Sequence, residues 1–252
     1  MRETFYESKR DNTGGIIHLL LYNVECDMHF HIATEILFVR KGKVRYSCSS
    51  ETDILQAGEA VFLPSFFSHK FQAVGESETE TLMIPHRFLN NFQKYYQNVS
   101  FPKLNDRETN KEIYPLFQEI ETRIKENANE FLLAALVDHI LALIATNYPA
   151  VPYSKMDTLM VDIVKYINDN LANISSITDV SGHFGYNPSY FSRLFKKLFE
   201  IPFSTYINRL RCDFIEERRG TASVSDLLYQ AGYGTSSTYY RNKTKTNRPP
   251  QQ

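Results

Sequence analysis

Three histidines and one glutamate in the first third of the chain have the types and spacing of metal ligands. They are His29, His31, Glu35 and His69. Alternate side chains of a β-strand point to the same face, so His29 and His31 would lie side by side on a strand. Neutral imidazoles with a carboxylate suit iron, nickel, copper or zinc. Alternatively, these histidines line a pocket and hold no metal.

A second group of residues, between 176 and 199, has the pattern of two short helices joined by a tight turn. Ser176-x-x-Asp179 forms a capping box, and Asn187-Pro188 is typical of the start of a helix. In the second helix Phe191, Leu194, Phe195 and Leu198 form an apolar stripe. The opposite face carries Ser189, Ser192, Arg193, Lys196 and Lys197. This layout is typical of a helix-turn-helix that places its second helix in the major groove of DNA.

The same pattern recurs 47 residues later, over residues 223–246. Ser223-x-x-Asp226 repeats the capping box, and Gly232-Tyr233 repeats Gly185-Tyr186. A helix from about 203 to 215 would connect the two units, which could then reach groove segments about one turn (~34 Å) apart. The alternative is a structural helical repeat with a solvated charged face.

The second unit departs from the first in its apolar stripe. Tyr239 takes the place of Phe191, but Asn242, Lys243 and Thr246 take the places of Leu194, Phe195 and Leu198. An unpaired buried lysine is prohibitively costly. We therefore expect this last helix to shift, fray or pack loosely.

The elements around these groups define two domains. Short β-branched and aromatic runs separated by turns fill residues 1–86 and predict an antiparallel barrel, and helical periodicity over about 107–148 predicts a helical hairpin. The proline-containing linker after this hairpin divides a domain of residues 1–152 from an all-helical domain of residues 153–252. The predicted fold class is α+β.

Composition narrows the class of protein. Residues 154–252 have 13 Lys+Arg and 9 Asp+Glu, a net charge of +4, whereas residues 1–153 have 15 and 20, a net charge of −5. A basic half favours contact with a polyanion. The three cysteines form no C-x-x-C pair, there is no apolar signal stretch, and no run approaches about 18 apolar residues. We expect a cytoplasmic protein that does not bind a membrane.

Residues 187–211, NPSYFSRLFKKLFEIPFSTYINRLR, resemble the signature of the AraC/XylS transcription regulators, and residues 227–245 are a weaker echo of it. The resemblance implies base contacts by Ser189, Ser192 and Arg193, a phosphate contact near Lys196, and a second set of readers at Ser236, Ser237 and Arg241. Arginine's planar fork suits guanine O6 and N7. Lys197, Arg209 and Arg211 are either phosphate contacts or a solvated face. The resemblance also implies a longer closing segment than NRPPQQ.

The histidine pattern in turn resembles the two motifs of cupin barrels, in which facing strands supply three histidines and a glutamate to one metal. Phe66 stands where the second motif usually has glycine, and Ala73 where it usually has asparagine. This resemblance implies a jelly-roll (cupin-like) barrel, and the resemblance to the AraC/XylS regulators implies that the barrel binds an organic effector. No cofactor is expected other than a candidate divalent transition metal at His29, His31, Glu35 and His69.

Three functions follow from these observations. The leading hypothesis is a non-enzymatic, homodimeric transcription regulator that binds double-stranded promoter DNA and a small-molecule effector, with RNA polymerase as a candidate partner. The family resemblance assigns dimerisation to the helical hairpin. The first alternative is a metal-dependent cupin enzyme with a helical appendage. The second is a modulator that binds no DNA and forms mixed dimers with related regulators.

Overall fold

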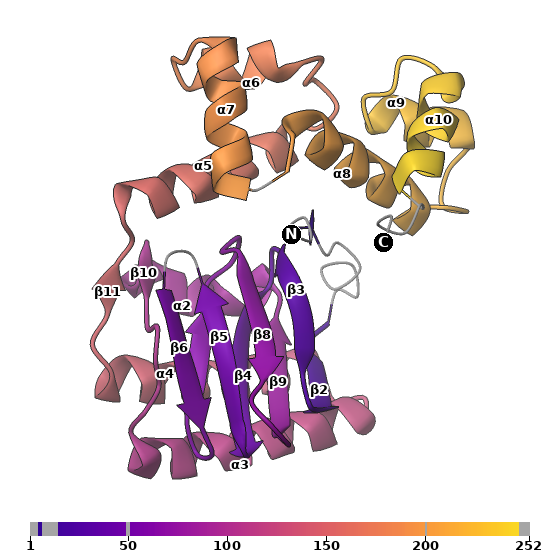
Figure 1. The fold of residues 1–252 in the computed structure, drawn as a ribbon. Helices are drawn as coiled ribbons and strands as arrows, with labels where there is room; N and C mark the ends of the chain where they lie inside the picture. The colour runs from indigo at the N-terminus through magenta and orange to yellow at the C-terminus, as the bar shows by residue number, and fades with distance from the viewer. Residues whose placement is uncertain (1–4, 7–14, 49–50, 200, 247–252) are drawn as a thin grey trace. The chain divides into compact units, whose positions relative to one another are not determined.

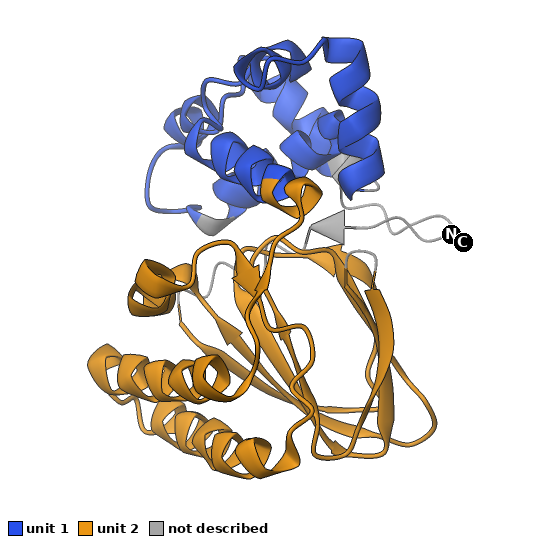
Figure 2. Ribbon diagram, turned by 90° about the vertical axis from the view of Figure 1, so that its left-hand side faces the viewer, with its two compact units in different colours: residues 1–12, 159–252 blue, residues 13–158 orange. Residues whose placement is uncertain are grey.

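The computed structural model describes residues 5–6, 15–48, 51–199 and 201–246. The chain divides into two compact units, residues 13–158 in one and residues 1–12 and 159–252 in the other (Figure 2). The sequence predicts a division after residue 152, six residues earlier. The difference arises because the chain is still held to the first unit beyond residue 152, where the backbone N–H of Tyr153 donates to the carbonyl of Asn98 at 2.8 Å.

Two antiparallel sheets form the greater part of the first unit (Figure 1). One has the strand order β2-β9-β4-β7, and in the other β3, β8, β5 and β6 lie in that order. These strands are β2 (Ile17–Tyr22), β3 (Glu25–Phe30), β4 (Thr34–Lys41), β5 (Lys43–Cys48), β6 (Glu51–Gln56), β7 (Ala60–Leu63), β8 (His69–Ala73) and β9 (Glu78–Ile84). The two-residue strand β1 (Phe5–Tyr6) belongs to the residues 1–12 that group with the second unit. The mixed fold with an N-terminal antiparallel barrel is the predicted one.

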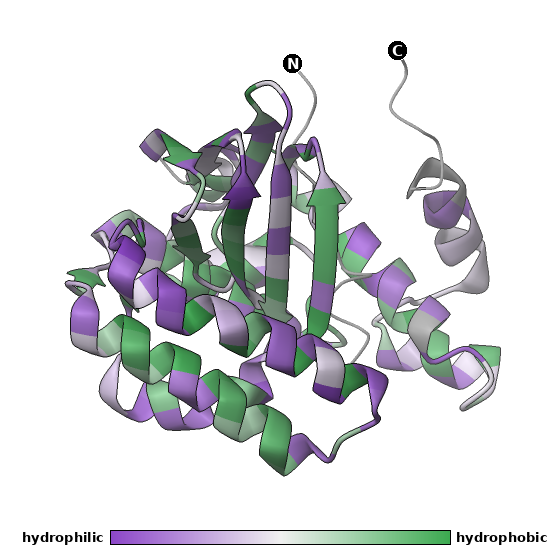
Figure 3. Ribbon diagram, turned by 90° about the horizontal axis from the view of Figure 1, so that it is seen from below, coloured by the Kyte–Doolittle hydropathy of each residue, from purple (hydrophilic) through white to green (hydrophobic). Residues whose placement is uncertain are grey.

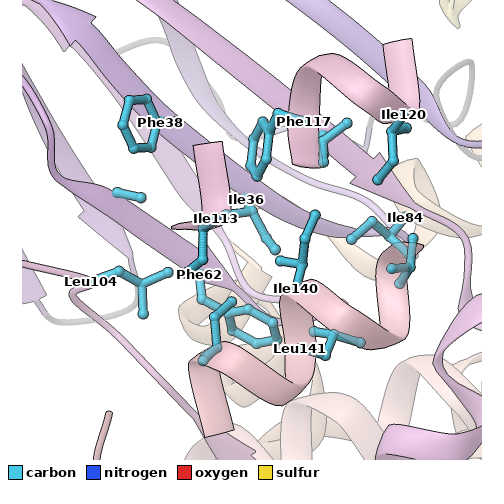
Figure 4. Packing of buried hydrophobic residues seen from close by; sticks show 14 of the residues in the cluster. Ile36, Phe38, Phe62, Ile84, Leu104, Ile113, Phe117, Ile120, Ile140 and Leu141 are labelled. Atoms are coloured by element: carbon cyan, nitrogen blue, oxygen red, sulfur yellow. The ribbon is translucent and has the colours of Figure 1, made fainter. Parts of the chain in front are cut away.

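Strand β4 is buried on both faces, because it separates two hydrophobic cores. Leu37 and Val39 pack with residues of both sheets, among them Val44 and Phe71, in the interior of the barrel. Their neighbours along the strand point the other way, as alternate side chains do. Ile36 and Phe38 therefore lie in the outer core, between the sheet and the helices (Figure 4).

The helical hairpin covers this outer face. It consists of α3 (Arg107–Lys125) and α4 (Glu130–Asn147), preceded by the short elements η1 (His86–Leu89), α2 (Asn90–Tyr95) and β10 (Val99–Ser100) and followed by β11 (Val151–Pro152). The side chains of Asp106 and Asn129 cap the two long helices. Ile113 and Phe117 of α3 and Ile140 of α4 are fully buried in the outer core (Figure 4).

Among the described residues, α4 is the one helix long and apolar enough by length and composition to cross a membrane. Its buried face nevertheless joins the core of a folded unit through Val137, Ile140 and Ile144. Hydrophobic residues recur along the hairpin when the unit is seen from below (Figure 3). One face of α4 is thus packed in the core of the first unit, and a second apolar face is left exposed.

The second unit is helical over its described residues from 159 onward. Its helices are α5 (Lys155–Asp169), which begins in the first unit, α6 (Ile177–His183), α7 (Pro188–Phe199), α8 (Phe203–Glu217), α9 (Val224–Gln230) and α10 (Ser236–Thr246). The pairs α6–α7 and α9–α10 are two helix-turn-helix units joined by α8, as the repeated pattern predicts. Residues 247–252, the NRPPQQ segment, lie outside the described residues.

Candidate functional site

Helix α7 is held by its apolar stripe and by caps at its entrance. The Ser176–Asp179 capping box is present at the start of α6, and Gly185 has the positive φ of +71° that suits the turn. The Asn187 side chain accepts a hydrogen bond from the backbone N–H of Ser189 at 2.9 Å. Phe191 is fully buried. These contacts fix which face of α7 points outward.

The outward face of α7 is polar and basic. All five residues predicted from the sequence are exposed: Ser189, Ser192, Arg193, Lys196 and Lys197. Within the part of the chain that the structure describes, none of the three cations has an ion-pair partner, so their charges are available to an anion. Tyr190, which the sequence analysis does not single out, lies on the edge of this face and is 49% exposed. The one feature of the sequence that indicates the exposed position of Tyr190 is its place between Ser189 and the buried Phe191.

The second helix-turn-helix is well formed, although its stripe is polar. The Asn242 amide donates to the side-chain oxygen of Asn208 at 2.7 Å, and the Lys243 ammonium donates to Glu216 at 2.7 Å. Glu216 also accepts from the hydroxyl of Tyr239, which is 1% exposed. The expected shift or fraying of α10 is not found over Tyr239, Asn242 and Lys243, because α8 supplies a partner for each of these three side chains. The side chain of Thr246 lies outside the described part of the chain. Ser236, Ser237 and Arg241 are exposed on α10.

The two arginines of α8 differ in their surroundings. Arg211 is buried, and its guanidinium donates to the backbone carbonyls of Leu171 and Ile174. Burial lowers its pKa. This residue ties α8 to the segment after α5, so it is a structural residue and no phosphate contact. Arg209 is half-buried.

The histidine cluster lies inside the first unit. His29 comes from β3, His31 follows that strand, Glu35 lies on β4, and His69 begins β8. The four side chains are at most 1% exposed, and one potential ligand atom of each lies within 4.8 Å of the others. Their positions follow from strand pairing, since His29 lies directly opposite His69.

Hydrogen bonds orient the three imidazoles in the same way. Each Nδ1 lies 2.8–2.9 Å from a backbone carbonyl oxygen, that of Asp27, Ala33 or Phe67 for His29, His31 and His69 respectively. A carbonyl only accepts, so each Nδ1 carries a proton, and each Nε2 points into the cluster. Such outer hydrogen bonds are typical of histidines that ligate metals.

The charges inside the cluster are those of a cation site. Burial, followed by repulsion from His69 and His31, lowers the pKa of His29 from 6.5 to about 3. Burial raises the pKa of Glu35, but the hydrogen bond from His31 and the proximity of His69 outweigh it and hold that pKa well below 4.5. The Nε2 of His31 is 2.9 Å and that of His69 3.4 Å from the Glu35 carboxylate. A metal ion would take the place of the proton between the His31 Nε2 and Glu35, and imidazole nitrogens with an anionic carboxylate are a donor set that fits a divalent transition metal.

Comparisons with known proteins match two parts of the chain to two different families. Residues 167–208 match the family described as bacterial regulatory helix-turn-helix proteins, AraC family, and residues 20–85 match the cupin domain. The second helix-turn-helix lies outside the AraC-family match. No curated protein matches the chain in sequence.

Solved structures with a similar fold include two of ToxT from Vibrio cholerae. The structure from strain SCE256 with an unsaturated fatty acid has a TM-score of 0.50 at 14% identity, with 92% of this chain and 91% of that one covered. The structure from strain O395 bound to (E)-4-(8-methylnaphthalen-1-yl)but-3-enoic acid has a TM-score of 0.53 at 11% identity, with 93% and 96% covered. At these identities the likeness shows the fold.

The chain thus combines an AraC-family helix-turn-helix domain with an N-terminal cupin domain. This is the composition of the AraC-type transcription regulators, the family that residues 187–211 resemble.

Proposed function

We propose that this protein is a cytoplasmic transcription regulator that reads promoter DNA mainly through α7. The observation that carries the proposal is the outward face of α7, where Arg193 and Lys196 are exposed on a helix rigidly held by its buried stripe. This helix lies within the AraC-family match.

Each residue of the α7 face has a definite role in this proposal. The Arg193 guanidinium donates two hydrogen bonds to guanine, and Ser189 and Ser192 contact neighbouring base edges. Lys196 and Lys197 neutralise phosphates, and the half-buried Arg209 is assigned a further phosphate contact. Ser236, Ser237 and Arg241 on α10 form the second reading set, on a helix whose exposed residues match those of α7 in type.

The cupin unit is the proposed regulatory half. Its effector is bound in the barrel, and preference of that effector for one conformation of the protein changes occupancy of the promoter. The similar fold of ToxT holds a fatty acid in one of its structures. The interior of this barrel contains the histidine cluster. A metal ion, or a ligand that forms hydrogen bonds, therefore fits this interior better than a fatty acid chain does.

We propose a divalent transition metal as the species that the cluster holds, with His29, His31 and His69 supplying Nε2 and Glu35 an oxygen. Support comes from the convergence of these atoms within 4.8 Å of one another. Metal analysis and calorimetric titration with Zn²⁺ test this proposal. Metal binding that His69→Ala abolishes would support the proposed metal site. A wild-type protein that takes up no metal would contradict it.

The same cluster favours a second candidate function, a metal-dependent cupin enzyme. Four ligands leave coordination positions open on a six-coordinate metal, which such chemistry needs. An oxygen-consumption assay on the metal-loaded protein would distinguish an oxygenase from a regulator.

Homodimerisation through α4 is the proposed assembly. Beyond its buried face, α4 exposes Phe131 (86%) and Leu132 (37%) together with Ala135, His139 and Ala142. The one charged side chain classed as exposed on α4, Glu130, lies at its first residue and pairs with Arg87. An exposed apolar stripe on one helix is self-complementary in a two-fold dimer. Leu132→Glu is expected to give a monomer by light scattering, and an unchanged dimer would exclude this face.

Fluorescence anisotropy against a pool of genomic upstream fragments tests the function. The wild type is expected to bind a few fragments tightly. Arg193→Ala is expected to weaken binding to those fragments selectively. Measurement at two salt concentrations separates phosphate contacts, which salt weakens, from base contacts. Equal, salt-sensitive binding to all fragments would contradict sequence-specific regulation and favour the mixed-dimer modulator.

A further inference from the structure

The connection between β7 and β8 contains a strained turn. The backbone N–H of Phe67 donates to the carbonyl of Pro64 at 3.3 Å, which closes a four-residue β-turn. Phe66, the third residue of the turn, has a φ of +71°. That position normally has glycine or asparagine, and a bulky side chain in the left-handed region costs roughly 1–2 kcal/mol. Burial of the Phe66 ring, which is 5% exposed, holds the residue in this conformation.

The last two residues of the turn are each hydrogen-bonded to a histidine of the cluster. The backbone N–H of Phe66 donates to the carbonyl of His31 at 2.9 Å. Two residues before β8, the carbonyl of Phe67 accepts from the Nδ1 of His69 at 2.8 Å. The turn therefore cannot move without moving the backbone of one candidate ligand and the imidazole of another.

The side chain of Phe67 contacts the segment that leads out of the first unit. Its ring is 7% exposed and packs on the ring of Tyr153, with centroids 4.8 Å apart and planes inclined by 56°. The backbone of Tyr153 is itself held by a 2.8 Å hydrogen bond from its N–H to the carbonyl of Asn98. Two residues later, α5 begins, and from residue 159 onward this helix belongs to the second unit (Figures 1 and 2).

We propose that the turn of residues 64–67 transmits occupancy of the histidine cluster to the start of α5 through the contact between Phe67 and Tyr153. This inference rests on the proposed binding of a metal by the cluster. A cation that draws the Nε2 atom of His69 to bonding distance would rotate that imidazole, and the hydrogen bond from its Nδ1 to the Phe67 carbonyl would pass the movement to the turn. The hydrogen bond from Phe66 to the backbone carbonyl of His31 would couple the turn to any shift of the His31 backbone. A strained turn persists only while its surroundings impose it, so a small change there releases a discrete rearrangement.

The chain contains no tryptophan, so Tyr153→Trp places a single fluorescent reporter at the contact. The variant is titrated with Zn²⁺, and heat of binding is measured in parallel by calorimetry. We expect the tryptophan emission to change and to saturate at the same stoichiometry as the heat. Adding Phe67→Leu, which keeps the backbone carbonyl, is expected to leave the heat and reduce the emission change at least threefold. Phe131→Trp, on the exposed end of α4, is the matched control and should show no change.

Two failures are distinguishable. Absence of binding heat in the wild type overturns the metal proposal, and this inference with it. Binding heat without an emission change, or with an equal change in the Phe67→Leu background, overturns the coupling alone. If the tryptophan variant unfolds, Tyr153→Leu in the wild-type background replaces it. In that variant Zn²⁺ is expected to bind as before but no longer to alter the Kd for DNA, whereas a Zn²⁺ effect equal to that of the wild type contradicts the proposal.

Discussion

Acidification of the metal-free protein should destabilise the first unit through His29. The ring of His29 is fully buried, with its centroid 4.3 Å from that of His69 and 5.7 Å from that of His31. Burial and these two neighbours lower its pKa from 6.5 to about 3. The unfolded chain therefore takes up a proton below pH 6.5, whereas the folded one does so only near pH 3. Stability contributed by neutral His29 is present above pH 6.5 and is lost as the pH falls from 6.5 towards 3.

The size of the loss follows from the same two values. Linkage between a pKa of 6.5 and one of about 3 gives a loss of about 2 kcal/mol at about pH 5, and about 5 kcal/mol once the pH is below both. Glu35 adds no slope in the upper part of this range. Its pKa is held well below 4.5, so its stabilising contribution is present above pH 4.5 and is lost only below it.

Urea unfolding followed by far-ultraviolet circular dichroism measures this loss. Between about pH 7.5 and about pH 5 the wild type should lose about 2 kcal/mol more than His29→Gln, which removes the titrating group. His183→Gln, at an exposed histidine of the other unit, is the matched control and should follow the wild type. Equal pH dependence in the wild type and His29→Gln would refute the reasoning.

Three further perturbations test contacts that hold the elements in place. Arg211→Ala leaves two backbone carbonyls without their donor and should lower the free energy of unfolding of the second unit by about 2–3 kcal/mol, measured with urea. Arg193→Ala, at an exposed position, should change the same free energy by less than about 0.5 kcal/mol. Equal effects of the two substitutions would contradict the structural role of Arg211. Glu216→Ala removes the partner of the buried Tyr239 hydroxyl and should speed amide exchange across α10 but not across α7, and unchanged exchange in α10 would show that the polar contacts do not hold it. Phe66→Gly relieves about 1–2 kcal/mol of backbone strain but removes a buried ring worth about 3–5 kcal/mol, so a net loss of about 1–4 kcal/mol is expected by calorimetry, and a gain would show that strain dominates.

Local patterns in the sequence are sufficient to predict most of the fold. Helical periodicity places the hairpin at 107–148, and α3 and α4 run from 107 to 147. The capping box and apolar stripe predict α6 and α7, because these signals depend on neighbouring residues along the chain. The exposed face of α7 is predicted for the same reason.

Contacts between distant residues could not be predicted in this way. Glu216 and Asn208 of α8 satisfy the polar residues of α10, 27 and 34 positions away along the chain, so the polar stripe of α10 alone gave no sign of a well-packed helix. Arg211 has the residue type of a phosphate contact, but its burial depends on the segment after α5. The strained conformation of Phe66 likewise follows from its tertiary surroundings, although the departure from glycine at this position marks the turn as unusual.

The most direct test of whether α7 reads DNA is to select binding sites from a pool of random duplexes. The selected duplexes are sequenced for the wild type and for Arg193→Ala. Arg123→Ala, at an arginine of α3 in the other unit, is the matched control. We predict that the wild type selects a defined motif and that Arg193→Ala loses preference at one guanine, by about 1–3 kcal/mol, while the rest of the motif persists. A motif that Arg193→Ala leaves intact, or no motif from the wild type, would contradict base reading by α7.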